Sequence, residues 1–545
     1  MRFQQVLIVK PLLEKLESGL KQAKTGLLVT WNNDDILLVT GCLQCSEKDE
    51  PKVQFQNFLP GGFHIGGRFG TSCKSIDDDE ISVQLNEEKN VLVKLSSNVI
   101  QYEVVASKEA SELLDSSTIQ FCVKGNLTTT LPVGNGLIQI PSEILSNRNL
   151  AFCLEEKKLL LHDASDFQTT TCESLLEKTK GKQTVSGSSG PVKCKILRRT
   201  SCHETKYVPT IECNQNDQKV VKFPLCIEML SYVNKTLPLN KLYDELRNSL
   251  SRQINSFNSC LRKETRIKCG VPKFLYFQPY GWCHPIAISY PSNKSDTDLL
   301  DFRKNTLHST FLVPDTKPVF RRKNAIALFP NKESLLLANT HIGLPTPRIP
   351  DGKLFLVKGN YDYHHYMQDR MDDNGWGCAY RSLQTLISWF RNQAYTEEKI
   401  PTHKEIQQIL VDVGDKPKEF VGTRKWIGSI EVSAVLNQYL GITSKIMFVS
   451  QGSELTNRGR ELAMHFTNQG TPIMIGGGVL AHTILGVCFS ETTGETRFLI
   501  LDPHYTGGED LKVIQDKGWC GWKGPNFWNQ TAYYNLCLPQ VPEMC

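Results

Sequence analysis

The sequence predicts an α+β protein, because helical periodicity marks its middle and helices are followed by strands towards its C-terminal end. Residues 237–263 place apolar side chains at steps of three and four, which is typical of an amphipathic helix. Thr402 and Glu405 have the spacing of a capping box before an apolar helix, and Ser429 can cap a second helix that ends at Gly441. The uninterrupted apolar run from Phe498 to Leu501 predicts a buried strand. In the C-terminal part we therefore expect helices first and strands last.

Composition indicates a globular protein with enough chain for two or three domains. The 545 residues are 40% hydrophobic and 22% charged. The net charge of +5 is small for this length and is not gathered into long basic runs, so nucleic-acid binding has little support. The first ten residues lack the pattern of a signal peptide. We expect a cytosolic or nuclear protein whose 18 cysteines are reduced.

The most linker-like stretch runs from Gly181 to Pro191, which is rich in serine and glycine. It predicts an α+β binding or scaffolding module over residues 1–165, with strands such as Ile36–Thr40 and Val91–Lys94, and then a flexible linker over residues 166–195. A second N-terminal subdomain is expected over residues 196–335. For its helix at 237–263 we favour packing in a core over docking a partner. The domain at 336–545 contains six of the eight tryptophans and is expected to be the denser core.

Cys378 has the surroundings of a reactive thiol. It follows Gly375-Trp376-Gly377 and precedes a run of good helix formers, so it is expected to open a helix. The free amides and the dipole at a helix N-terminus favour the thiolate. The two glycines would let a substrate backbone approach Trp376 and would permit positive φ in the turn. Trp376 and Gly377 are therefore our candidate substrate-binding residues.

Asp502-Pro503-His504 supplies a base and an orienting carboxylate. In extended chain, residues two apart point to the same side, and their Cα atoms are about 7 Å apart. A hydrogen bond from the His504 imidazole to Asp502 would fix the tautomer and leave the other ring nitrogen for Cys378. Each piece alone is more often structural, since lone cysteines are commonly buried thiols and Asp-x-His commonly marks a turn. Together in one domain, Cys378, Asp502 and His504 predict nucleophilic catalysis by a thiolate.

The stretch from Asn374 to Ser382, together with Asp502 to Tyr505, resembles the ubiquitin-fold modifier proteases. Further likeness lies in Tyr361–Tyr366, Met474–Thr483 and Gly518–Gly524, so the resemblance covers about residues 345 to 545. It implies a papain-like cysteine protease domain. It also implies a substrate, the C-terminal Val-Gly tail of ubiquitin-fold modifier 1, which the enzyme would trim in the precursor and release from lysines of conjugated proteins.

The resemblance implies roles for four residues: Cys378 as the nucleophile, His504 as base and acid, Asp502 as its orienter, and Tyr366 as an oxyanion donor. The chemistry is sound, because a tetrahedral intermediate needs donors aimed at its oxygen. From the sequence alone, Tyr366 reads as a half-buried aromatic in a loop rich in tyrosine and histidine. Its catalytic role rests on the resemblance.

No cofactor or metal is expected. His364 and His365 are neighbours, so on a strand they would point in opposite directions, and no partner is clearly spaced for zinc. Cys42 and Cys45 lack a second, well-spaced pair of cysteines, so two ordinary thiols are favoured over a zinc site or a redox motif. His482 is expected to be a buried histidine that could line the cleft. An aromatic cluster near the C-terminal end consists of Trp519, Trp522 and Trp528. It is interpreted as core or cleft wall, with Cys520 as a structural thiol.

Two other function classes remain open. A related autophagy-type protease shares the Gly-Trp-Gly-Cys turn and Asp-Pro-His but processes another ubiquitin-like modifier. A non-catalytic adaptor would act through its N-terminal half, although it would not need all three residues of the triad. The resemblance suggests recruitment to the endoplasmic-reticulum surface by a membrane adaptor that binds the N-terminal region. Direct insertion is not expected, because a proline, three glycines and a histidine divide the uncharged stretch Thr471 to Ser490 into two short strands.

Overall fold

In the computed structural model the chain forms two compact units. The N-terminal unit comprises Met1–Pro314 and Ala325–Pro330, and the C-terminal unit comprises Asp315–Asn324 and Asn331–Cys545. The residues that the structure describes are 3–22, 24–33, 35–45, 52–70, 80–86, 90–95, 98–132, 140, 145, 150–163, 170–176, 191–198, 220–262, 271–314, 318–329 and 336–542.

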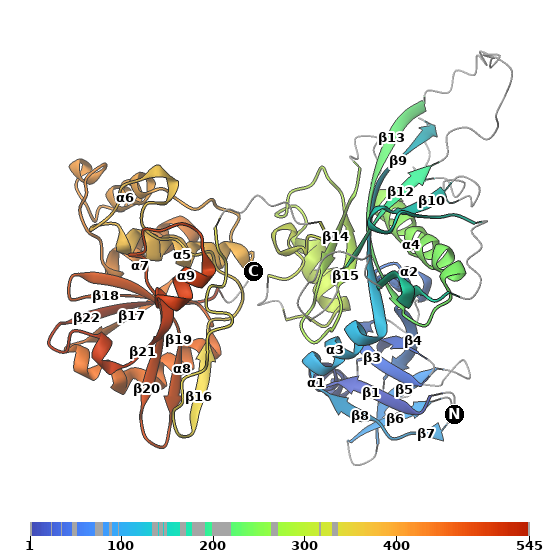
Figure 1. Ribbon diagram of the computed structural model, residues 1–545, viewed down its shortest axis with the longest axis horizontal. Coiled ribbons are helices and arrows are strands. Elements are labelled where there is room, and N and C mark those ends of the chain that lie inside the picture. Colours follow the sequence, from blue (N-terminus) through green and yellow to red (C-terminus); the bar gives the residue numbers. More distant parts are fainter. Residues whose placement is uncertain are drawn as a thin grey trace. The chain divides into compact units, whose positions relative to one another are not determined.

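The N-terminal unit contains three sheets, shown from blue to yellow-green in Figure 1. The largest is mixed and has the order β7-β6-β5-β4-β2-β3-β1-β8; its strands are β1 (Gln5–Val9), β2 (Gly26–Asn32), β3 (Ile36–Gln44), β4 (His64–Phe69), β5 (Ile81–Leu85), β6 (Val91–Leu95), β7 (Asn98–Val99) and β8 (Glu103–Val105). The second has the order β11-β10-β12-β9-β13, and its strands are β9 (Thr118–Pro132), β10 (Leu150–Leu154), β11 (Leu159–Leu161), β12 (Val192–Arg198) and β13 (Val220–Asn234). A two-stranded sheet joins β14 (Lys273–Phe277) and β15 (Ile286–Tyr290).

The helices of this unit are α1 (Lys10–Lys21), α2 (Lys52–Gln56), α3 (Ser107–Ser117) and α4 (Leu242–Arg262). The predicted amphipathic helix is α4, which packs against β13 and β15. Its apolar stripe belongs to the hydrophobic core of the second sheet, so the preference for a core-packing helix is confirmed. The stripe consists of Leu242, Leu246, Leu250, Ile254, Phe257 and Leu261, all buried.

The division of the first 335 residues differs from the one that the sequence indicated. Strand β12, at the end of the expected 166–195 linker, pairs with both β9 and β10, which precede that linker. Strand β13, beyond the linker, pairs with β9 over fifteen residues. Residues 166–195 therefore connect strands of one sheet. Serine and glycine indicate a connection without telling whether its two ends return to the same sheet, and Gly181–Gly190 lies outside the described residues.

The C-terminal unit is built on one antiparallel sheet, orange to red in Figure 1. Its order is β17-β22-β18-β19-β20-β21, and β16 pairs with the far part of β19. The strands are β16 (Gly352–Leu356), β17 (Ser444–Val449), β18 (Ile473–Gly477), β19 (Leu480–Ser490), β20 (Thr496–Leu501), β21 (Cys520–Lys523) and β22 (Tyr534–Pro539). The predicted strands at 473–475, 479–489 and 498–501 are thus present, as β18, β19 and β20.

Helices pack against this sheet: α5 contacts β18 and β19, α7 contacts β17 and β22, and α8 contacts β16 and β19. The helices are α5 (Cys378–Asn392), α6 (His403–Asp412), α7 (Ser429–Leu440), α8 (Gly459–Asn468) and α9 (Leu511–Asp516). Helices α5 to α7 precede most of the strands. This confirms the expected papain-like α+β arrangement, in which a helix that begins at the cysteine lies against an antiparallel sheet.

The two predicted helix caps had different outcomes. Thr402 and Glu405 form the expected capping box, with the Thr402 N–H donating to Glu405 at 2.8 Å. Ser429, expected to be an N-cap, is instead the first residue of α7, and Gly428 takes the cap position. The Ser429 hydroxyl is buried beside the start of β22, and it donates to the carbonyl of Asn535 at 2.7 Å. Gly441 ends the helix at a φ of +67°, as expected for a C-cap glycine.

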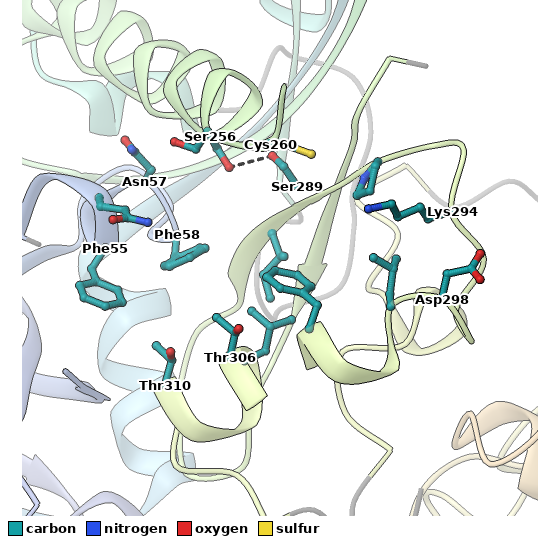
Figure 2. A pocket seen from close by; sticks show the side chains of 17 residues that line it. Phe55, Asn57, Phe58, Ser256, Cys260, Ser289, Lys294, Asp298, Thr306 and Thr310 are labelled. Atoms are coloured by element: carbon teal, nitrogen blue, oxygen red, sulfur yellow. Dashed lines mark hydrogen bonds between the residues drawn. The ribbon is translucent and has the colours of Figure 1, made fainter. Parts of the chain in front are cut away.

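A cavity of about 500 Å³ opens in the N-terminal unit between α2, α4, β15 and the segment after β15 (Figure 2). Its polar floor includes the hydroxyls of Ser256 and Ser289, which are 2.7 Å apart. Aromatic and aliphatic side chains form much of the wall, among them Phe55, Phe58 and Leu299. A cavity of this size is within the range of ligand or side-chain pockets. Within the described part of the chain, no helix combines the length and apolar character needed to cross a bilayer.

Candidate active site

Cys378 is the first residue of α5, as the sequence predicted, and its side chain is only 9% exposed. The turn before it is tied to the carbonyl of Asp373, which accepts from the N–H groups of Trp376 and Gly377. The first amides of a helix have no intrahelical acceptor, and the backbone of Cys378 lies against the Tyr366 phenol. The thiol and the backbone N–H of Cys378 thus lie together at the N-terminal end of α5.

Glycine is required at positions 375 and 377 of the turn for different reasons. Gly375 has a φ of +81° and needs the conformational freedom that the sequence suggested. Gly377 has a φ of −88°, so the expectation of positive φ does not hold there. Space is the constraint instead, because a Cβ at position 377 would lie 2.6 Å from the Cβ of Asp373. The indole of Trp426 covers the turn and donates to the Gly375 carbonyl at 3.2 Å.

Asp502 and His504 are hydrogen-bonded, but by a turn and not by extended chain. Strand β20 ends at Leu501, and Asp502 Oδ1 accepts from both the backbone N–H of His504 at 3.0 Å and its ring Nδ1 at 2.5 Å. The expectation of extended chain through Pro503 was therefore wrong. An aspartate side chain that bonds the amide two residues on stabilises such a turn, and it holds the imidazole against the same carboxylate.

The electrostatics favour a thiolate paired with an imidazolium. Burial alone would raise the pKa of the Cys378 thiol, but the neighbouring His504 side chain and its charge lower that pKa below its ordinary value. Burial alone would lower the pKa of His504, yet its bond to Asp502 and the nearby Cys378 thiol raise that pKa to about 9. Since Nδ1 is bonded to Asp502, Nε2 is the ring nitrogen left for the sulfur. Both shifts favour the charged pair.

Tyr366 lies at this pair, although it comes from a loop twelve residues before the nucleophile. Its side chain is 2% exposed, and its ring is perpendicular to that of His504, with centroids 5.3 Å apart. The phenol is hydrogen-bonded to Cys378, and burial together with the negative charge of that thiol raises the phenol pKa. The hydroxyl therefore keeps its proton and can donate it to a developing oxyanion.

The segment that carries Tyr366 is clamped to the segment that carries His504. The Tyr366 N–H donates to the Pro503 carbonyl at 2.9 Å, and the Tyr363 hydroxyl donates to the Asp502 carbonyl. His365 Nδ1 lies 3.0 Å from the Tyr505 carbonyl, and its Nε2 lies 3.1 Å from Glu509. The sequence did not predict this clamp. The two segments are about 140 residues apart along the chain, and neither has a periodic pattern that would pair them.

A buried ionic group joins the same loop to α5. Asp373 accepts from the Met367 N–H at 2.8 Å through Oδ1 and from Arg381 Nε at 2.6 Å through Oδ2, and His403 Nε2 lies 3.1 Å from Oδ2. Arg381 also donates to Asp369 and to the Gln368 carbonyl. Burial would raise the pKa of Asp373, but its bonds to His403 and Arg381 lower it.

This group holds a strained stretch of backbone. Met367, Asp369 and Arg370 have φ values of 64°, 59° and 57°, in the region that residues other than glycine rarely adopt. All three lie within the four residues after Tyr366. The Asp373 group therefore stabilises the conformation that places the phenol beside Cys378. The sequence signal was weak, because Asp373 reads as one of two aspartates in a polar turn.

His482 is buried and also lines the cleft, so both parts of its prediction describe the structure. Its Nε2 lies 3.8 Å from Asp502 Oδ2, and its ring is 5.2 Å from that of His504. Burial lowers its pKa to about 4, so it is neutral at ordinary pH. A pocket of about 460 Å³ is lined by these three polar residues, His482, Asp502 and His504, together with Leu480, Phe527 and Trp528.

His482, Asp502 and His504 each offer one potential metal-ligand atom, all within 4.8 Å of one another. Two of these atoms are already joined, since His504 Nδ1 is bonded to Asp502 Oδ1. The donor set is thus engaged in orienting the imidazole. His364 and His365 do not lie on a strand as assumed, but both are buried in the loop before Tyr366.

The predicted substrate-binding residue Trp376 is 7% exposed and packs edge-on against Tyr380 and His403, with ring centroids 5.5 and 5.4 Å away. Neither Trp376 nor Gly377 lines the pocket beside His504. The indole N–H is buried without a hydrogen-bond partner among the residues that the structure describes. Contact of these two residues with substrate stays a prediction. Cys520 is fully buried, and burial raises its pKa to about 12, so it is not a reactive thiol.

Comparison with known proteins gives concordant results for both units. Residues 352–537 match Peptidase family C78, and residues 149–334 match the family described as Ubiquitin-fold modifier 1 specific protease 2, N-terminal. The chain is 55% identical over 328 residues to Ufm1-specific protease 2 of Homo sapiens, which is 57% of this chain and 70% of the human protein. Over 360 residues it is 53% identical to the Danio rerio protein of the same name, covering 65% of this chain and 89% of the relative. The chain belongs to the Ufm1-specific protease 2 family.

A solved structure agrees over the whole length. The crystal structure of UfSP from C. elegans covers 99% of this chain and 100% of its own, with a TM-score of 0.69 at 26% identity. Membership in the Ufm1-specific protease 2 family confirms the resemblance seen at the cysteine and Asp-Pro-His motifs. It excludes the autophagy-type alternative, and the match to a peptidase family makes the chain an enzyme and not a non-catalytic adaptor.

Proposed function

We propose that Cys378, His504, Asp502 and Tyr366 carry out the chemistry of this protein, a cysteine peptidase of family C78 that processes the Ufm1 precursor and deconjugates Ufm1. The observation that carries the proposal is geometric: Cys378 begins α5, the His504 ring is bonded to Asp502, and the Tyr366 ring packs against His504. In this setting the pKa of Cys378 is lowered and that of His504 is raised to about 9. Such a pair gives a nucleophile and a general acid at neutral pH.

The reaction follows from these positions. The Cys378 thiolate attacks the carbonyl carbon of the last glycine of the tail, and the carbonyl oxygen becomes an oxyanion. The Tyr366 hydroxyl and the Cys378 N–H are the donors for that oxygen, and one such donor contributes about 10² to 10³ in rate. His504 gives its proton to the leaving amine, and a thioester remains. His504 then takes a proton from water, which hydrolyses the thioester and restores the thiolate.

Covalent capture tests this assignment. Ufm1 and, separately, an autophagy-type modifier are each given a C-terminal thiol-reactive electrophile and incubated with the wild-type protein and with Cys378→Ala. Mass spectrometry should show a 1:1 adduct with Ufm1 only, and none with Cys378→Ala. Cys520→Ala is the matched control, because its thiol is buried and its pKa is raised, and this variant should react like the wild type. An adduct that persists in Cys378→Ala would refute the nucleophile.

We also propose that the N-terminal unit recruits the enzyme to the endoplasmic-reticulum surface by binding a membrane adaptor. The support is a unit with its own hydrophobic core and without the catalytic residues, and a cavity in it with much apolar lining (Figure 2). Apolar pockets of several hundred Å³ are common receptors for the anchor side chains of a partner.

A further inference from the structure

The hairpin between β18 and β19 carries an unexpected residue at its tip. Gly477 pairs with Leu480, which leaves Gly478 and Val479 as a two-residue turn. Both have positive φ, +57° and +69° respectively. Two-residue hairpin turns of this kind favour asparagine or glycine at both central positions. A β-branched residue at positive φ is a true outlier, so Val479 strains the backbone at this point.

Val479 does not compensate for this strain by packing. Its side chain is 72% exposed, and that of its neighbour Leu480 is 49% exposed. Glycine or asparagine would form the turn with less strain and would not place an isopropyl group in water. Strained positions of this kind tend to occur at functional sites, where the side chain is needed for contact.

The tip is part of a larger apolar surface. Phe448 on β17 and Tyr533 just before β22 are 54% and 50% exposed and stack with their ring centroids 6.4 Å apart. Tyr534, the next residue, pairs with Gly477 at the base of the hairpin. A Cβ on Gly478 would lie 3.4 Å from the Cβ of Ala532. We call the set Phe448, Val479, Leu480 and Tyr533 the hairpin patch.

The hairpin patch adjoins the catalytic pocket. Leu480, Gly477 and Gly478 line the same pocket as His482, Asp502 and His504, so one side of the hairpin faces Asp502 and His504. The backbone of Ala481, the next residue of β19, lies beside the Cys378 thiol. An extended tail advances about 3.3 Å per residue. A folded body that precedes a short tail in this pocket must therefore lie against the surface that surrounds the pocket. Large exposed apolar groups beside a site commonly mark the surface that binds the partner.

We propose that the hairpin patch binds an apolar face on the folded body of the ubiquitin-fold modifier while its tail lies in the catalytic pocket. This rests on the proposed function, and it adds a surface that selects the folded modifier over other glycine-ended tails. Val479 is its central contact, because its strained position serves neither the turn nor the core. Charged side chains are not among the four patch residues, so binding through this surface depends little on salt.

Val479→Asn tests the proposal, because asparagine suits positive φ and removes the apolar contact. Two substrates are compared: the folded modifier carrying a C-terminal fluorophore, and a short peptide of its tail with the same fluorophore. Val479→Asn should raise KM for the folded modifier about five- to tenfold, with kcat unchanged. Hydrolysis of the tail peptide should stay as in the wild type, and the midpoint temperature of unfolding should rise.

Met464→Ser is the matched control, since Met464 is 56% exposed on α8 and lies outside the hairpin patch. It should behave as the wild type with both substrates. An unchanged KM for the folded modifier in Val479→Asn would overturn the proposal, and so would an equal loss on both substrates, which would mean that the hairpin only shapes the pocket. If the wild-type protein cleaved neither substrate, the proposed function itself would fail.

Discussion

The charge state of Cys378 depends on His504, because the surroundings of the thiol otherwise act against ionisation. The side chain is buried, and burial by itself raises a thiol pKa. The same holds in reverse for His504, whose pKa burial alone would lower. The closeness of the two groups favours the charged form of both, so each depends on the other for its charged state. The two groups therefore titrate as a pair.

The pair predicts a particular pH dependence. The pKa of His504 is raised from 6.5 to about 9, so the imidazolium is present throughout neutral pH and is lost as the pH rises through about 9. The thiolate, whose pKa is lowered, is already formed below that pH. Hydrolysis of a tail peptide should fall above about pH 9, because the leaving amine then lacks its acid. Alkylation of Cys378 by iodoacetamide should not fall, because it needs only the thiolate.

The matched variant is His504→Asn, which removes the charge and keeps a polar group of similar size. Burial then dominates, and the thiol pKa rises, so alkylation at pH 7 should slow at least about tenfold, since one pKa unit corresponds to a factor of ten. His465→Asn is the control. His465 is likewise buried, but it lies on α8 and its ring is hydrogen-bonded to Thr471 instead of to a group of the candidate site. An alkylation rate in His504→Asn equal to that of the wild type would contradict the ion pair.

Residue types and spacing were enough to predict the placement of Cys378 and the bond between Asp502 and His504, because both depend on local chain geometry. The form of that bond was not predictable, since an aspartate that bonds the amide two residues on can replace extended chain after a strand. The Asp373 group and the His365–Glu509 contact were missed for a different reason. They join loops, and loop pairing leaves no period in the sequence.

At the scale of the elements, the link between α5 and the loop of Tyr366 is the part of the site most open to test. Asp373 is tied to Arg381 of α5 and to the backbone of Met367 in the loop. It thereby couples the helix that carries the proposed nucleophile to the loop that carries the proposed oxyanion donor. The strained residues Met367, Asp369 and Arg370 require such a hold, at roughly 1–3 kcal/mol each.

Asp373→Asn should therefore lower kcat for the tail peptide by up to about 10²-fold with little change in KM, because it loosens the position of the Tyr366 hydroxyl. It should also destabilise the fold by up to about 3–5 kcal/mol, since the buried Arg381 loses its buried carboxylate and keeps only Asp369, whose side chain is 71% exposed, as an ionic partner. Alkylation of Cys378 at pH 7 reports whether the variant is folded with its thiolate intact. The measurement is steady-state kinetics beside urea unfolding.

A double-mutant cycle separates positioning from general damage. If Asp373 acts through Tyr366, then Asp373→Asn should cost little further activity in a Tyr366→Phe background. Asp372→Asn is the control, because the Asp372 side chain is 60% exposed and lies 3.8 Å from Arg424; it should be neutral. Fully additive losses for Asp373 and Tyr366 would refute the link between them.

Element prediction was most successful where one apolar face specifies one element. Helix α4 and strands β18 to β20 follow directly from their patterns. It failed at the 166–195 segment, because Ser and Gly content reports a connection but not its topology. Residues of β9 pair with residues of β13 that lie 88 to 116 positions later, and only the three-dimensional pairing shows that both strands belong to one sheet.

At the scale of the whole molecule, chemistry and core packing divide between the two units. Cys378, Tyr366, Asp502 and His504 all come from the C-terminal unit, whose core surrounds them. The N-terminal unit has a separate core formed by α4 and the second sheet. A unit that contributes no catalytic side chain but keeps its own core and a cavity of about 500 Å³ is suited to bind a partner.

This division predicts a double dissociation. Phe55→Asp places a charge in the wall of the cavity, so binding of an apolar anchor there should weaken at least about tenfold, and the fraction of protein that cosediments with microsomal membranes should fall accordingly. Hydrolysis of the tail peptide should be unchanged. Cys378→Ala should do the opposite, abolishing hydrolysis and leaving cosedimentation intact. Val99→Asp, at a position 62% exposed in the same unit, should alter neither. Full cosedimentation of Phe55→Asp would place the adaptor-binding surface elsewhere on the molecule. Loss of hydrolysis in Phe55→Asp would mean that the N-terminal unit contributes to catalysis and that the two functions are not divided between the units.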